Sequence, residues 1–411
     1  MNLFSLPKNY TIQSDLFAGI TVGVVTIPQA MAFSLLAGLP PIYGLYGAFI
    51  PLVVYAFFST SNYLNVGPVS VIAIFIYEAI SPTFQPFSQD YVGAVVMMGI
   101  MTGALQVFAG VFSLGKHIHY LPKGVISGFV QAAAVVIMLS QLSPAFEVQF
   151  SNNLGYVERL VYLLTNPTKI HLLSALFFTV SLISLFFSAA YFPKFPMAVC
   201  LLLFTGFLAY FFSLEQYGIR LIGEVPKGLP KYITPKFSLS SLQFFPAALG
   251  IAFVATIGSY IMAKNVEDRQ SNPLNFDRDL VALGFSKIIS AFFGSLIPAG
   301  SFNRSILNIK LGAKTQISSL VAAVVILLTT LFLTGVIYFL PQAVIAALIV
   351  FAVYYLFDVE LVKELLATNR KEAFFLLLTF VTTLALGFVH GIVLGMAATL
   401  STNYIIKKRI N

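Results

Sequence analysis

The chain has 411 residues, of which 58% are hydrophobic and only 9% are charged, and its mean hydropathy is +0.91. Soluble domains carry about 25% charged residues, so this composition excludes a soluble globular protein and indicates a polytopic membrane protein. The formal net charge of +8 does not indicate a nucleic-acid partner, because the basic residues lie in loops between apolar segments.

Apolar runs of about 20 residues recur along nearly the whole chain, and we predict about fourteen membrane segments in an all-α fold. The predicted segments start near Asp15, Pro41, Gly67, Tyr91, Gly124, His171, Pro196, Phe244, Asp277, Ala299, Gln316, Pro341, Glu372 and His390. An even number of crossings places both termini on one side of the bilayer. Lys and Arg are more frequent in the loops of that side, so the positive-inside rule predicts cytoplasmic termini in the inner (plasma) membrane.

The stretch between Leu214 and Gln243 contains three prolines and is expected to be an extended extracellular loop. It divides a single transmembrane transport domain, residues 1–411, into one repeat at about 10–213 and a second at about 244–407. About seven segments in each half is an odd number, so the two halves must insert in opposite senses. The sequence therefore predicts two inverted repeats.

Each half also contains two breaks in its apolar pattern. In the first half, Pro28-Gln29 is followed roughly forty residues later by the stretch from Asn65 to Ser70. In the second, Gly258-Ser259 is followed at a similar spacing by the stretch from Gly300 to Arg304. Irregular backbone at membrane depth is tolerated only where it lines a cavity or is buried in protein. We therefore expect two half-helices that meet near the bilayer midplane.

Arg304 is the most informative single residue. Pro298 interrupts any helix that arrives from the N-terminal side, and Ser301 can cap a new helix that contains Arg304. A lone arginine at this depth costs roughly 2.5–3.5 kcal/mol on insertion scales. The arginine could also snorkel to an interface or pair with a carboxylate, but no Asp or Glu lies between Asp279 and Glu360. We expect an anion site to which Arg304 contributes charge rather than shape.

Four stretches resemble the SulP family of inorganic anion transporters, the sulfate-permease group that includes prestin. The first runs from Asp15 to Tyr46 and contains Ile27-Pro-Gln-Ala-Met31, and the second is Val66-Gly-Pro-Val-Ser70. The third runs from Val125 to Ala134, together with Leu139-Ser-Gln-Leu142, and the fourth is Gly300-Ser-Phe-Asn-Arg-Ser-Ile-Leu-Asn308. The stretch Gly223-Glu-Val-Pro-Lys-Gly-Leu-Pro230 supports the same resemblance. The resemblance implies fourteen membrane segments in two inverted repeats, arranged as a core and a gate domain.

The resemblance also implies a substrate anion between the two half-helices. Gln29 and Phe33 share one face of the first helix, although ordinary packing would also explain Phe33. Backbone N–H groups at the two half-helix starts would face the anion. The residues expected at the site are Gln29, Phe33, Gly67, Val69, Ser70, Gly258, Gly300, Ser301, Phe302, Asn303 and Arg304.

Two departures from the family affect the functional prediction. Most members continue into a cytoplasmic STAS domain, whereas this sequence stops at Asn411. Many members that couple to protons or sodium have an acidic residue where this chain has Gly258. We therefore expect anion exchange or facilitated flux rather than cation symport, unless Glu267 or Asp268 folds back towards the site.

The predicted function is secondary transport of a small anion: bicarbonate, sulfate, chloride or a dicarboxylate. An anion channel and a sodium- or proton-coupled symporter remain alternatives. An enzyme is not expected, because the membrane segments lack paired titratable groups. No cofactor, metal or nucleic acid is expected; the expected partners are the anion and the lipid bilayer, and a homodimer is left open.

Overall fold

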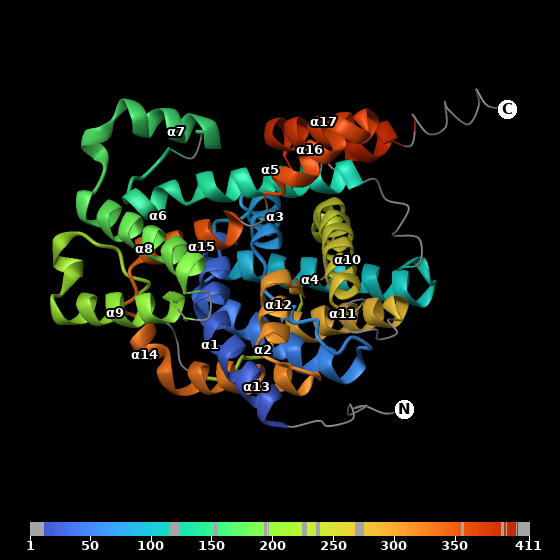
Figure 1. Ribbon diagram of the computed structural model, residues 1–411, viewed down its shortest axis with the longest axis horizontal. Helices are drawn as coiled ribbons and strands as arrows, with labels where there is room; N and C mark the ends of the chain where they lie inside the picture. Colours follow the sequence, from blue (N-terminus) through green and yellow to red (C-terminus); the bar gives the residue numbers. More distant parts are fainter. Residues whose placement is uncertain are drawn as a thin grey trace. The chain divides into compact units, whose positions relative to one another are not determined.

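The computed structural model describes residues 12–115, 123–151, 154–192, 195, 197–223, 228–235, 239–267, 275–354, 357–387, 390–391, 393–399 and 401. This part of the chain is almost entirely helical (Figure 1). It forms two compact units, one from Met1–Ile118 and Ser188–Ile345, the other from His119–Phe187 and Ala346–Asn411.

The first unit contains most of the elements that concern the candidate site. Its helices are α1 (Ile12–Leu36), α2 (Pro41–Phe58), α3 (Ser70–Ile80), α4 (Gln89–Val111), α9 (Met197–Phe211), α10 (Phe245–Glu267), α11 (Phe276–Ala291), α12 (Phe302–Lys310), α13 (Ile317–Leu328) and α14 (Thr334–Ile337). Its strands are β1 (Val66–Gly67) and β2 (Ala299–Gly300). The short helical turns Leu214–Tyr217, Leu239–Phe244 and Thr329–Leu333 complete its described elements.

The second unit consists of α5 (Lys123–Ser140), α6 (Leu142–Phe146), α7 (Tyr156–Thr165), the turn Pro167–Lys169, most of α8 (Leu172–Tyr191), most of α15 (Gln342–Tyr354), α16 (Val359–Thr368) and α17 (Arg370–Leu386). Within it, α5 packs along α17. The backbone N–H of Gly124 donates to Glu372 Oε2 at 2.6 Å and joins the starts of these two helices.

Helix packing in the first unit follows a two-fold pattern. If α1, α2, α3 and α4 are matched in chain order with α10, α11, α12 and α13, several contacts have counterparts: α1 packs against α13 as α10 packs against α4, and α2 packs against α13 as α11 packs against α4. Helices α2 and α11, which correspond to one another, pack together. This pairing agrees with the predicted inverted repeat.

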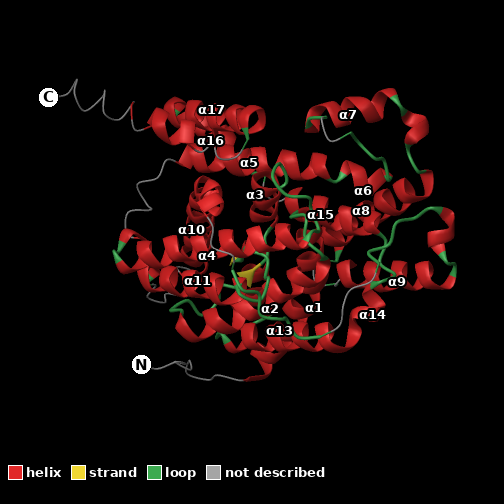
Figure 2. Ribbon diagram, turned by 180° about the vertical axis from the view of Figure 1, so that it is seen from behind, coloured by secondary structure: helices red, strands yellow, loops and turns green. Residues whose placement is uncertain are grey.

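The two strands form an antiparallel pair at the breaks between α2 and α3 and between α11 and α12 (Figure 2). Val66 pairs with Gly300, and Gly67 pairs with Ala299. Pro68 follows β1 at once and cannot donate a further backbone hydrogen bond, so the chain turns from the short strand into α3. The two half-helices predicted from the sequence therefore start from one shared strand pair.

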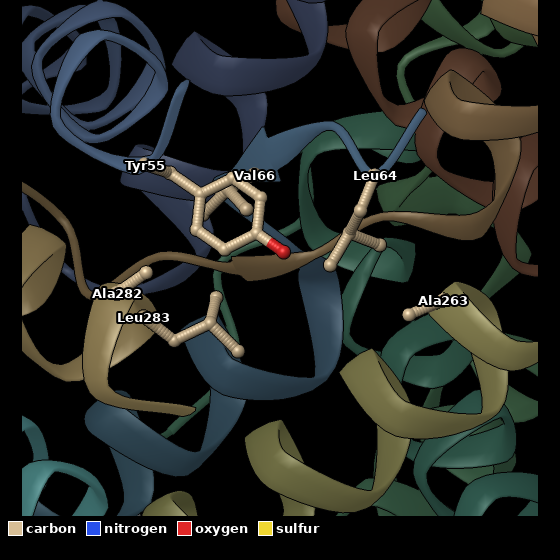
Figure 3. Close-up of a cluster of buried hydrophobic side chains, with 6 residues drawn as sticks. All are labelled: Tyr55, Leu64, Val66, Ala263, Ala282 and Leu283. Atoms are coloured by element: carbon tan, nitrogen blue, oxygen red, sulfur yellow. The ribbon is translucent and has the colours of Figure 1, made fainter. Parts of the chain in front are cut away.

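An apolar cluster lies behind this strand pair (Figure 3). Leu64 and Val66 belong to the first break, and both side chains are fully buried. Tyr55 of α2, Ala263 of α10 and the neighbouring pair Ala282 and Leu283 of α11 complete the cluster. Because it joins both repeats, this cluster fixes the irregular backbone against three long helices.

The membrane-spanning character of the chain is visible in its described helices. Seven helical stretches are long and apolar enough to cross a bilayer, and three shorter apolar helices include α3. A helix or half-helix starts within a few residues of each predicted position, including the helical residues 390–391 and 393–399. Helices α7 and α16 are additional to the prediction; they carry exposed leucines such as Leu164 and Leu366 beside charged residues.

Candidate functional site

Both half-helices begin with backbone N–H groups that have no acceptor inside the helix. Val69 is the N-cap of α3, and the first helical bond there runs from Ala73 N to Val69 O at 3.1 Å. Ser301 is the N-cap of α12, and Ser305 N donates to Ser301 O at 3.1 Å. The three N–H groups after each cap donate to no partner among the described residues. The site thus combines two partially positive helix ends.

Arg304 joins the two half-helices and is only 1% exposed. From the first turn of α12, its Nε donates to Asn65 Oδ1 and its Nη1 donates to Pro68 O, each at 2.9 Å. Nη2 is buried and, within the described residues, has no hydrogen-bond partner. It lies beside Gly67, where a Cβ would come within 3.0 Å of it. These bonds give Arg304 a structural role in addition to the predicted contribution of charge.

Asn65 connects the first break to α12 through its backbone as well. Its N–H donates to Ser305 Oγ at 2.9 Å, and its carbonyl accepts the N–H of Ser301 at 2.9 Å. Ser305 Oγ in turn donates to Ser301 O at 2.7 Å. Ser301 occupies the predicted N-cap position, but its side chain makes no capping hydrogen bond. Since its N–H is already donated, the group that Ser301 can offer to a ligand is its hydroxyl.

Helix α10 supplies the side of the site next to β2. Ser259 Oγ accepts the N–H of Gly300 at 3.0 Å. A Cβ on Gly300 would lie 2.9 Å from Ser259 Oγ and 3.0 Å from Leu64 Cδ1, so glycine permits this close approach. A Cβ on Gly258 would instead meet no heavy atom of the described residues within 4 Å. The backbone at Gly258 therefore borders open space and presents no carboxylate.

The other predicted site residues lie on the same elements. Gln29 is half-buried and makes no hydrogen bond with the described residues, and Phe33 is 6% exposed; both belong to α1, which packs against α3 and α12. Ser70 is buried at the start of α3, and Asn303 is exposed in the first turn of α12. Phe302 begins α12, but its side chain lies outside the described part, as do the side chain of Glu267 and all of Asp268.

Sequence analysis missed the roles of two polar residues. Asn65 lies within the predicted first break, and Ser259 follows Gly258 in the other repeat. A polar side chain in an apolar segment is the signal that could have identified both, because a buried polar group needs a partner. Their partners could not be inferred, since Arg304 lies 239 positions from Asn65 in the chain.

Two helix N-termini and a buried arginine meet at a strand pair inside a multi-helix membrane fold, an arrangement typical of membrane proteins built on broken helices. A family comparison makes the assignment specific. The chain belongs to the sulfate permease family, whose model matches residues 12–379.

Individual relatives agree with this assignment. The "Probable sulfate transporter 4.2" of Arabidopsis thaliana is 32% identical over 400 residues, which cover 94% of this chain and 58% of that protein. The "Sodium-independent sulfate anion transporter" of Bos taurus is 28% identical over 406 residues, covering 90% of this chain and 66% of that protein. The chain therefore spans less than two thirds of the length of these relatives. Both relatives carry the name of a transporter.

Solved structures share the fold. The murine solute carrier 26 family member A9 anion transporter, in its inward-facing state, matches 97% of this chain and 69% of that chain with a TM-score of 0.88 at 23% identity. The transmembrane domain of the cyanobacterial bicarbonate transporter BicA matches 94% of this chain and 98% of that chain with a TM-score of 0.82 at 24% identity. The predicted all-α membrane fold is confirmed.

Proposed function

We propose that this chain carries a small inorganic or carboxylate anion across the cytoplasmic membrane as a secondary transporter, by exchange or facilitated flux with alternating access. The observation that supports this most directly is the site at the strand pair β1–β2. Two half-helix N-termini and the buried guanidinium of Arg304 lie there, and no carboxylate in the described part of the chain forms an ion pair with that guanidinium. An anion is the ligand that such a field favours.

The substrate is drawn from bicarbonate, sulfate, chloride and dicarboxylates. Sulfate is the anion in the names of the plant and bovine relatives, and bicarbonate is the anion in the name of the cyanobacterial structure. The N–H groups of two helix ends are suited to oxyanions, which offer several acceptor oxygens. Gln29 would add amide donors, Phe33 would add its ring edge, and the backbone N–H of Phe302 would face the anion. Val69, Ser70, Ser301 and Asn303 would provide the remaining contacts.

The absence of a side chain at Gly258 supports exchange or facilitated flux. A sodium or proton symporter needs a group that binds the cation near the anion, and a carboxylate is the usual choice. Without one, the empty site keeps an unneutralised positive field, which disfavours its movement across the membrane. Cation symport is the alternative if Glu267 or Asp268 approaches the site.

A counterflow experiment tests this proposal. Purified protein in proteoliposomes would take up one labelled anion while a panel of bicarbonate, sulfate, chloride and dicarboxylates competes. We expect the rate of uptake to depend on an internal counter-anion and to be unchanged by a sodium or proton gradient. Concentrative uptake that is driven by an inward cation gradient, with no internal anion, would show that the protein is a symporter and not an exchanger. Current that persists without any counter-anion would indicate a channel.

The placement in the membrane belongs to the same proposal. The distribution of Lys and Arg among the loops supports cytoplasmic termini in the plasma membrane. Labelling of single cysteines in a Cys200→Ser background, with a reagent that does not cross membranes, tests the orientation. Crosslinking in membranes tests for a homodimer.

A further inference from the structure

A second cation lies buried in the first unit, away from the residues of the candidate site. Lys287 of α11 is only 1% exposed, and its Nζ donates to Gln106 Oε1 of α4 at 2.7 Å. Within the described residues, no carboxylate forms an ion pair with it. It lies about one turn before Ala291, where α11 ends and its partial negative charge favours a cation. Ionisable residues inside membrane segments are rare and usually functional.

A hydrogen-bonded chain connects this lysine to the helix that borders the site. Gln106 Nε2 donates to Thr256 Oγ1 of α10 at 2.7 Å, which leaves the amide oxygen for Lys287. Thr256 and Gly258 are separated by about 200° around the helix axis. Thr256 therefore faces α4, whereas Gly258 faces the opposite side, where its Cβ would meet open space. Only the width of α10 separates Lys287 and Gln106 from that space.

We infer that Lys287 is a remote electrostatic determinant of anion affinity, which attracts the anion through α10 without touching it. This inference rests on the proposed function. No carboxylate in the described part of the chain forms an ion pair with Lys287 or Arg304, so with both side chains protonated their fields add at the site. At a separation on the order of 10 Å and an effective dielectric constant of about 20, Coulomb's law gives roughly a tenfold effect on the affinity for a monovalent anion and roughly a hundredfold effect for a divalent one.

A purely structural role for Lys287 makes a different prediction. Helices α4 and α11 already pack closely without the lysine: a Cβ on Gly103 would lie 2.7 Å from Gly284 O, and one on Gly284 would lie 2.6 Å from Gly103 O. If the lysine served only to hold these helices together, its loss would affect all anions equally. An electrostatic effect scales instead with the charge of the ligand.

Three variants of the full chain separate charge from hydrogen bonding. Lys287→Met removes both, and Gln106→Glu keeps an acceptor for the lysine but neutralises its charge. Thr256→Val breaks the hydrogen bond from Gln106 to α10 but leaves Lys287 and its acceptor in place. The dissociation constants of chloride and sulfate would be measured by anion-dependent thermal stabilisation of the purified protein.

We expect Lys287→Met and Gln106→Glu to weaken binding roughly tenfold for chloride and roughly a hundredfold for sulfate. Thr256→Val is expected to remain close to wild type. If only one of the two anions binds the wild type, the contrast between Gln106→Glu and Thr256→Val still decides, and it does so even if Lys287→Met fails to fold.

Wild-type affinity in Gln106→Glu, or an equal loss in Thr256→Val, would overturn the inference while leaving the proposed function intact. If the wild type binds none of the anions in the transport panel, the proposed function fails, and the inference fails with it.

Discussion

Replacing Gly258 by aspartate places a negative charge where the proposed function requires none. A Cβ at this position would meet no heavy atom within 4 Å, so the side chain fits without displacing a neighbour. The next residue, Ser259, accepts the N–H of Gly300 at the start of the second half-helix, so the new carboxylate would lie beside the site. Its main effect is therefore electrostatic.

The magnitude follows from Coulomb's law. A carboxylate about 6 Å from a bound monovalent anion, at an effective dielectric constant of about 20, opposes binding by about 2.8 kcal/mol, or roughly a hundredfold in affinity. Binding of a sodium ion to the new carboxylate would cancel most of this repulsion. We therefore expect Gly258→Asp to bind anions about a hundredfold more weakly in choline buffer and to regain affinity in sodium.

The assay is anion-dependent thermal stabilisation of the purified variant in choline and in sodium buffers, with Gly258→Asn as the control of similar size and no charge. The asparagine variant should stay near wild-type affinity in both buffers. Wild-type affinity of Gly258→Asp in choline would show that this position is not near the anion. An equal loss in both variants would show that bulk, not charge, is what the site rejects.

Three further predictions follow from the same contacts. Arg304→Ala should lower both anion affinity and melting temperature, because two buried acceptors each lose a hydrogen bond from a charged donor, worth roughly 1.5–3 kcal/mol. Arg304→Lys should keep more affinity than the alanine variant. Unchanged anion binding in purified Arg304→Ala would show that this residue is not part of the site. Gly300→Leu should abolish transport, whereas Gly93→Leu, at a position with open space for a Cβ, should not; normal counterflow by the Gly300 variant would count against a close approach at the substrate. Asp15→Asn should weaken the hydrogen bonds that the carboxylate accepts from the backbone N–H groups of Lys314 and Thr315. The free energy of unfolding should fall by roughly 1–3 kcal/mol, with no change in anion affinity. A selective loss of anion binding would contradict this structural role.

The amino-acid sequence by itself determined the membrane class, the positions of the segments and the two broken helices. These features are local, because hydropathy over about 20 residues and the placement of Pro and Gly act within one segment. The breaks after Asn65 and before Arg304 were both visible for this reason. The family resemblance likewise rested on contiguous stretches such as Val66-Gly-Pro-Val-Ser70.

Other features could not be derived from any single segment. The amphipathic helices α7 and α16 lie in stretches that are too polar and too short to be distinguished from loops by hydropathy alone. Lys287 interrupts an apolar run and could have been noticed, but its partner Gln106 lies 181 positions earlier in the chain.

Only the tertiary structure decided how the broken helices meet. The strand pairing of Val66 with Gly300 and the bonds from Arg304 to Asn65 and Pro68 join residues more than two hundred positions apart. A buried donor or acceptor must find a partner, but the sequence does not specify which of many polar groups will be within reach. The packing of two inverted repeats makes that choice, and it determines which helix N–H groups remain free for an anion.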